Sequence, residues 1–332
     1  MHCELVVPRL FAEPSAARLP GVEMLLARGR CTSEQSCTFE TWLHDAFDLR
    51  EGPFAAGAYT ELGAGRDPGS ASWTRADPVH LRLMRDRLIL VPGAALNLRG
   101  DEAQALCDAL NQHFGERLEV RRVESDRWTA RLADEMAIEA ECPLEISGRD
   151  VDLGRAEGAD ASRSHKVMNE AQMVLHSHPV NAEREKRGEP TVNSIWLWGA
   201  GRASKNDRAR FQSVTARDPL VLGLAAAAGV RQQPLPVSAS AWLERAPEEG
   251  RHLIALDVLR APHALNQTGE YQDAMATLER DWFAPLLQAL REGRVGMVTI
   301  HVPDGGECAS YETIRGDLRR FWRRPKALEH YS

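Results

Sequence analysis

Apolar positions along this chain follow two patterns, one typical of a covered parallel sheet and one typical of half-exposed strands. Runs at 192–198, 253–258 and 295–302 are predominantly apolar. Strands of this kind are buried on both faces, as when helices cover both sides of a parallel sheet. A short apolar run at 4–7, ended by Pro8, predicts the first strand of the same sheet.

Segments with helical spacing lie between several of these runs. Their apolar residues recur every three or four positions, which is the period of an α-helix with one buried face. The helices predicted in this way cover 19–28, 40–47, 167–175, 220–229 and 271–291. A segment rich in Gly, Ala and Ser at 51–72 predicts a loop or weak helix near a boundary. The fold class expected is therefore α/β, with a mostly parallel sheet flanked by helices.

The second pattern occupies the middle of the chain. Residues 118–123 and 128–132 alternate apolar with charged side chains, as half-solvated antiparallel strands do. They follow a strand at 87–91 and a helix at 102–114, for which Asp101 is a good N-cap. A β-α-β-β unit is the simplest arrangement. We predict a small α+β insertion domain at 76–150 and a core made of residues 1–75 and 151–332.

Composition and net charge indicate which kinds of binding partner to exclude and in which cellular compartment to expect the protein. The chain has 332 residues, enough for two domains, and a net charge of -7, which argues against nonspecific binding to nucleic acid or to an anionic membrane. Its six cysteines include no Cys-x-x-Cys pair, its N-terminus lacks a signal-peptide pattern, and no apolar run approaches about 20 residues. We expect a cytoplasmic protein with reduced thiols.

A candidate ligand site follows the tryptophan-bearing strand. The strand leads into Gly199-Ala-Gly201, and Arg202 and Lys205 come directly after it. Backbone amides and basic side chains at such a corner can hold a phosphate or carboxylate. The segment lacks a dinucleotide or P-loop fingerprint, so a tight turn that needs glycine for backbone reasons is an equal alternative. The predicted ligand-binding residues are Asn193, Gly199, Gly201, Arg202, Lys205, His176 and His178.

Two histidines separated by one residue raise the question of a metal. His176 and His178 would point in different directions on one helix and could share an ion only where the helix has ended, which Pro179 favours. No Asp-x-x-x-His or His-Glu-x-x-His element accompanies them, so we expect capping or surface histidines and no metal. Trp196 and Trp198 face the same side of their strand and are expected in the core.

These same residues resemble a known family. His178-Pro-Val-Asn-Ala-Glu-Arg-Glu-Lys-Arg-Gly-Glu-Pro, followed by Asn193-Ser-Ile-Trp-Leu-Trp-Gly-Ala-Gly, resembles the archaeal-type, cofactor-independent phosphoglycerate mutases of the alkaline phosphatase superfamily. The block that begins at 76 is similar to the start of that family's inserted domain. Asn169-Glu-Ala-Gln-Met-Val-Leu-His, together with the tryptophan strand, looks closer still to the bacterial RpfE-type regulatory proteins.

The resemblance implies two divalent metals held by Asp and His, and a serine nucleophile that carries the phosphoryl group. The family's first strand ends in Asp-Gly, whereas this chain has Val7-Pro8-Arg9. Two further ligand segments correspond to 260–270 and 299–301, which keep His263 and His301 without their acidic companions. Two-metal phosphoryl transfer needs anionic ligands. We therefore predict a non-catalytic homologue without cofactor, with a regulatory or small-anion-binding role.

Two alternatives remain. A metal-dependent phosphomutase or phosphatase could hold two Mn or Zn ions in a rearranged site built from His263, His301, Asp304 and Glu307. A protein-interaction module could use the basic run at 315–324.

Overall fold

The structure is a computed structural model of the 332-residue chain. It describes residues 1–15, 17–34, 37–49, 53–84, 87–151, 156–205, 210–245, 249–304 and 308–331. The chain folds into two compact units. The first unit comprises Met1–Asp48 and Asn206–Ser332, and the second comprises Leu49–Lys205. Each is described by itself below.

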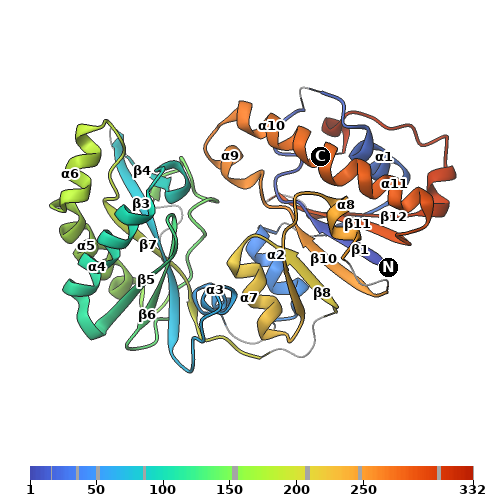
Figure 1. The fold of residues 1–332 in the computed structure, drawn as a ribbon. Coiled ribbons are helices and arrows are strands. Elements are labelled where there is room, and N and C mark those ends of the chain that lie inside the picture. The colour runs from blue at the N-terminus through green and yellow to red at the C-terminus, as the bar shows by residue number, and fades with distance from the viewer. Residues whose placement is uncertain are drawn as a thin grey trace. The chain divides into compact units, whose positions relative to one another are not determined.

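A seven-stranded sheet, counted over the described residues, forms the centre of the first unit (Figure 1). Its order is β2-β12-β11-β1-β10-β8-β9. The strands are β1 (His2–Val6), β2 (Arg30–Glu34), β8 (Ser213–Ala216), β9 (Arg231–Pro234), β10 (Arg251–Ala255), β11 (Met297–Pro303) and β12 (Cys308–Ile314). From β11 to β9 neighbouring strands are parallel, and β12 and β2 extend the sheet with antiparallel pairings. The predicted strands at 4–7, 253–258 and 295–302 are the three central strands, so the parallel core is confirmed.

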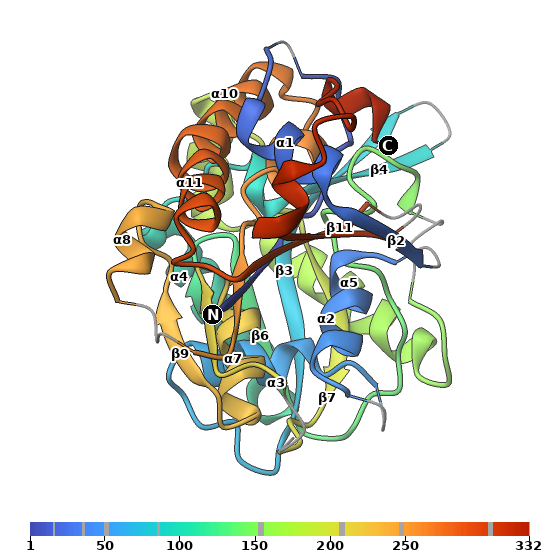
Figure 2. The same cartoon turned by 90° about the vertical axis from the view of Figure 1, so that its right-hand side faces the viewer.

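Helices cover both faces of this sheet. The helices are α1 (Pro20–Arg28), α2 (Phe39–Ala46), α7 (Pro219–Ala227), α8 (Ala239–Leu243), α9 (Arg260–Ala264), α10 (Thr268–Leu278) and α11 (Ala284–Glu292). Helices α1, α10 and α11 lie on one face (Figures 1 and 2), where Leu5, Ile254 and Ile300 join the main apolar core. Helices α2 and α7 lie on the other face.

The predicted helix at 271–291 contains a local change of winding. Helices α10 and α11 are joined by a π-helical turn, Glu279–Phe283. The Glu279 carboxylate accepts hydrogen bonds from the backbone N–H groups of Gly21 (2.6 Å) and Val22 (3.1 Å). Helix α1 has no side-chain cap at its own N-cap residue, Leu19, so this distant carboxylate satisfies its first free donors.

An antiparallel sheet forms the centre of the second unit. Its strands are β3 (Ser72–Met84), β4 (Arg87–Pro92), β5 (Leu118–Glu124), β6 (Arg127–Leu132) and β7 (Ser194–Gly201). The order is β4-β3-β6-β5, and β7 pairs with β3. The helices are α3 (Ala56–Gly63), α4 (Gly100–Phe114), α5 (Ala161–His176) and α6 (Pro179–Lys186). Figure 1 shows α4, α5 and α6 on one side of this sheet and α3 on the other.

The β-α-β-β arrangement of the middle segment is present, but its surroundings differ from the prediction in two respects. We expected the strand at 192–198 in the parallel sheet, whereas β7 runs antiparallel to β3. A strand buried on both faces is apolar in either kind of sheet, so its pattern does not identify its partner. The unit that contains 76–150 also includes residues 49–75 and 156–205, which we had assigned to the core.

Two further findings concern the start of helix α4 and the search for membrane-spanning helices. Helix α4 begins two residues earlier than predicted, with Arg99 in place of Asp101 at the N-cap, and Asp101 lies in its first turn, where a negative charge interacts favourably with the helix dipole. Within the described residues, no helix combines the length and the hydrophobicity that crossing a bilayer requires.

Candidate functional site

Two asparagine side chains connect the start of β7 to its neighbours. The Asn193 amide donates to the carbonyl of Leu81 (2.9 Å) and accepts from its N–H (2.7 Å), so it extends the pairing of β7 with β3. Asn181 donates to the carbonyls of Leu175 (2.8 Å) and Val192 (2.7 Å), and accepts from the Val192 N–H (2.9 Å). Backbone partners therefore occupy both amides.

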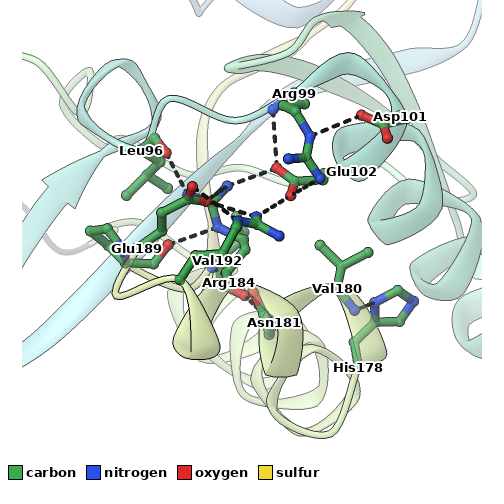
Figure 3. Close-up of polar contacts among 12 residues, drawn as sticks. Leu96, Arg99, Asp101, Glu102, His178, Val180, Asn181, Arg184, Glu189 and Val192 are labelled. Atoms are coloured by element: carbon green, nitrogen blue, oxygen red, sulfur yellow. Dashed lines mark hydrogen bonds and ion pairs between the residues drawn. The ribbon is translucent and has the colours of Figure 1, made fainter.

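The two histidines lie where α5 ends and α6 begins. His176 is the exposed last residue of α5, and His178 is the N-cap of α6. The His178 Nδ1 atom accepts the N–H of Val180 (3.2 Å, Figure 3). Burial lowers the pKa of His178, which favours the neutral ring that can accept this bond. The helix does end between the histidines, as Pro179 indicated, and His178 has a capping role.

The segment that follows His178 contributes two arginines to an ionic cluster around the buried Glu102 (Figure 3). Arg184 is 0% exposed, and it donates to Glu102 (2.8 Å) and to the carbonyls of Pro190 (2.9 Å) and Leu96. Arg99 (2.8 Å) and Arg187 (2.5 Å) also pair with Glu102. Burial would raise the pKa of Glu102, but these hydrogen bonds outweigh it and hold the pKa below its usual value. The cluster joins α6 to the start of α4.

Close packing against α3 explains the two glycines of the corner. Gly199 has φ +58°, and an added Cβ would overlap the Cβ of Ala56. A Cβ added at Gly201 would lie 3.0 Å from that of Ala55. The absence of side chains lets α3 approach β7 directly. The structural explanation for these glycines is therefore the close packing of α3 against β7, in addition to the positive φ of Gly199.

The polar residues after the corner lie at the surface. Arg202 Nε lies 2.7 Å from a Glu135 carboxylate oxygen, and both side chains are exposed. The hydroxyl groups of Tyr59 and Ser204 are 3.2 Å apart, and Lys205 is exposed. An anion bound here would compete with Glu135 for Arg202.

The structure separates the seven predicted ligand residues into two groups. Asn193 precedes β7, and His176 and His178 lie where α5 ends and α6 begins, whereas the other four, Gly199, Gly201, Arg202 and Lys205, form or follow the end of β7. Gly199 comes six residues after Asn193, so the two groups are separated by about 20 Å at about 3.3 Å per residue of strand. That the two groups contribute to one ligand site stays a prediction. Anion binding at the corner alone stays a prediction.

A second cluster lies at the carboxyl end of the central parallel strands, where open α/β sheets place ligands. Arg9 follows β1 and donates to the backbone carbonyl of Asp304, which follows β11 (2.7 Å). The Asp304 carboxylate accepts the N–H of Phe11 (3.3 Å), and His263 lies 3.4 Å from Glu13. Burial raises the pKa of Asp304, and the charge of Arg9 offsets this in part.

His301 uses both of its ring nitrogens elsewhere. Its Nε2 lies 3.2 Å from Glu4 and its Nδ1 lies 2.8 Å from the hydroxyl of Ser310. Arg251 donates to the second oxygen of Glu4 (2.5 Å). Burial would raise the pKa of Glu4, but the hydrogen bonds from His301 and Arg251 outweigh it and lower the pKa to about 2.

The residues of the rearranged metal site are therefore only partly brought together. Across the described ranges, no three His, Cys, Asp or Glu side chains are arranged to hold a metal ion. Glu307 lies outside the described residues. Sequence reasoning missed Glu4 and Ser310, although a carboxylate inside the apolar run Glu4-Leu-Val-Val was a visible signal.

Comparisons with known proteins connect this geometry to one group of enzymes. No family model matches the chain. The chain is 31% identical over 115 residues to the 2,3-bisphosphoglycerate-independent phosphoglycerate mutase of Methanosarcina mazei, a match that covers 34% of this chain and 29% of the mutase. It is 32% identical over 126 residues to a probable enzyme of the same name from Geobacter sulfurreducens, with 36% and 31% covered. These matches span less than a third of the relatives' length.

A solved structure resembles nearly the whole chain. The PH0037 protein from Pyrococcus horikoshii superposes with a TM-score of 0.59 at 14% sequence identity, covering 94% of this chain and 87% of its own. This likeness supports the fold alone. Homologues of this chain are thus 2,3-bisphosphoglycerate-independent phosphoglycerate mutases, and the predicted α/β fold class is confirmed.

Proposed function

We propose that this chain is a phosphoglycerate mutase-like homologue that has lost two-metal phosphoryl transfer and has a regulatory or small-anion-binding role. One observation carries the proposal. The Arg9 guanidinium lies at the carboxyl end of β1 and donates to Asp304, at the strand end where the resemblance leads us to expect a carboxylate ligand.

Electrostatics explains why this arrangement does not fit the metals. Two adjacent divalent ions require several anionic ligands that neutralise their charge. A guanidinium keeps its positive charge at all ordinary pH values and repels a cation beside it. His301 would also have to give up Glu4 or Ser310 before either ring nitrogen could bind an ion. The donor set therefore does not fit two metals, and we assign no step to them.

The proposed anion site is the corner formed by Gly199, Gly201, Arg202 and Lys205. In the variant Arg202→Ala/Lys205→Ala, we expect the dissociation constant for 3-phosphoglycerate or inorganic phosphate to rise at least tenfold. The reason is the loss of two charged donors, each worth more than an ordinary hydrogen bond. Isothermal titration calorimetry measures the change. Glu135→Gln serves as the matched control and should tighten binding, because it removes the carboxylate that pairs with Arg202.

Two results would overturn the proposal: one concerns the anion site, and the other concerns the loss of two-metal phosphoryl transfer. Unchanged affinity in the double variant would remove the anion site. Two Mn or Zn ions per purified chain, together with phosphatase or mutase activity, would instead favour the rearranged site at His263, His301 and Asp304. Elemental analysis and a phosphate-release assay on the same preparation distinguish these outcomes.

A protein-interaction role has one observation in its favour. Phe321 and Trp322 are 78% and 66% exposed, and their rings meet edge to face. Arg320 and Arg323 donate to the carbonyls of Arg28 (3.2 Å) and Gly29 (2.7 Å), which holds this turn against α1. Exposed aromatic rings among arginines suit an acidic protein partner.

The variant Phe321→Ser/Trp322→Ser tests this second candidate. Both side chains point to solvent, so we expect the fold to be unchanged and a partner cross-linked to the wild-type chain in extracts of its own cells to be lost. Circular dichroism checks the fold. Recovery of the same partners by both proteins would exclude the role for this turn.

A further inference from the structure

Three neighbouring strands of the first unit bring a carboxylate, an imidazole and a hydroxyl into one hydrogen-bonded chain. Glu4 lies on β1, His301 on β11 and Ser310 on β12. The Glu4 carboxylate lies 3.2 Å from His301 Nε2, and the Ser310 Oγ atom lies 2.8 Å from His301 Nδ1. All three face the side of the sheet where α2 packs, because the ring of His301 meets Trp42 at 5.0 Å.

Glu4 determines the direction in which the hydrogen bonds between these three side chains donate. An ionised carboxylate only accepts hydrogen bonds, so His301 Nε2 must carry a proton and donate it. In the neutral ring, Nδ1 then accepts from the Ser310 hydroxyl. Arg251 favours the ionised form of Glu4 and fixes its orientation. This is the relation of nucleophile, base and orienting acid that activates a serine.

Of the three side chains, the carboxylate of Glu4 is the most deeply buried. Glu4 is 1% exposed and the His301 side chain is 12% exposed, whereas Ser310 is half-buried. The orienting acid is thus removed from water, whereas Ser310, which carries the hydroxyl that would react, keeps part of its surface exposed. Trp42 packs on the imidazole and restricts its rotation.

A second serine–histidine pair in the same unit lacks two of these features. Ser213 Oγ lies 2.8 Å from His252 Nδ1, but His252 Nε2 lies 2.8 Å from the backbone carbonyl of Glu249, and this ring pairs with no carboxylate of the described residues. Ser213 and His252 are both completely buried. This pair offers an internal comparison, because it has the same two kinds of side chain but a backbone carbonyl at Nε2 and no exposed surface.

We propose that Ser310 is an activated nucleophile that attacks ester substrates. The Ser310 oxygen forms a bond to the ester carbonyl carbon, and His301 Nδ1 takes the hydroxyl proton. The carbon–oxygen bond to the alcohol then breaks, and His301 returns the proton to the departing alcohol. Water releases the acyl group as a carboxylic acid. This chemistry needs no metal and does not rest on the proposed anion-binding function.

A fluorophosphonate probe tests the proposal on the full chain. Ser310 would form a bond to phosphorus as fluoride leaves and the proton passes to His301. We expect peptide mass mapping to find the label on Ser310 and not on Ser213. Ser310→Ala should abolish labelling, whereas Ser213→Ala should leave it unchanged.

Conservative variants separate activation from simple exposure. Glu4→Gln keeps the side-chain size but presents an amide to His301, which disturbs the tautomer, so we expect labelling to slow at least tenfold. His301→Gln should slow it further. Thermal melts of each variant confirm that it is folded. Absence of label on Ser310 in the wild type would overturn the proposal. It would also be overturned if the folded Glu4→Gln and His301→Gln variants were labelled as fast as the wild type.

Discussion

Replacing Arg184 with alanine is expected to lower the free energy of unfolding of the second unit by about 3–5 kcal/mol. The substitution leaves the buried Glu102 carboxylate without one of its cationic partners, and it leaves the carbonyls of Leu96 and Pro190 without a donor. Buried groups that lose their partners bear the full cost of desolvation. Urea denaturation followed by hydrogen exchange of peptides within 87–205 measures the change.

Lys186→Ala is the matched control for this loss. Lys186 is on the same helix and also pairs with a glutamate, Glu183, but both side chains are largely exposed. Such surface pairs contribute about 0–1 kcal/mol. Similar effects for Arg184→Ala and Lys186→Ala would show that the buried cluster does not stabilise the unit as we infer.

The second large effect is expected at the glycine corner. Gly199→Ala places a Cβ against Ala56 and forces a left-handed conformation on a residue with a side chain. The conformation costs about 1–2 kcal/mol and the overlap about 1–3 kcal/mol more. We expect the free energy of unfolding of the second unit to fall by roughly the sum, as measured by urea denaturation.

Two further variants separate these contributions. Gly188 has φ +71° with nothing within 4 Å of an added Cβ, so Gly188→Ala should show the conformational cost alone. Adding Ala56→Gly to Gly199→Ala removes the overlap and should restore part of the stability. If Gly188→Ala is as destabilising as Gly199→Ala, close packing of α3 is not the reason for glycine at this corner.

The pattern of apolar residues along the sequence predicted the strands that are buried along most of their length. The central strands β1, β10 and β11 are buried on both faces, so their composition alone identified them. The edge strand β9 and the strand β12, which lies beside the opposite edge strand β2, were missed because partly exposed positions interrupt the apolar pattern. The four-residue strand β8 is too short to show a period.

The residues of the candidate site show the same division. The segment from His178 to Arg184 belongs to the motif on which the family resemblance rests, and its side chains bind backbone groups and a buried charge. Nothing in the local sequence indicates that Arg184 meets Glu102, because 82 residues separate them. The predicted ligand set combines Asn193, which precedes β7, with residues at the other end of that strand, although these residues are close in sequence.

The sequence by itself determined the α/β class, the central parallel strands, most of the helices and the resemblance to phosphoglycerate mutases. Each of these depends on neighbouring residues, whose periodicity reflects one buried face or two. The tertiary structure alone decided that β7 joins the antiparallel sheet and that Arg9 meets Asp304. It also decided that Glu4, His301 and Ser310 form one chain of hydrogen bonds. Such contacts join residues far apart in sequence, and only the packing of whole elements brings them within bonding distance.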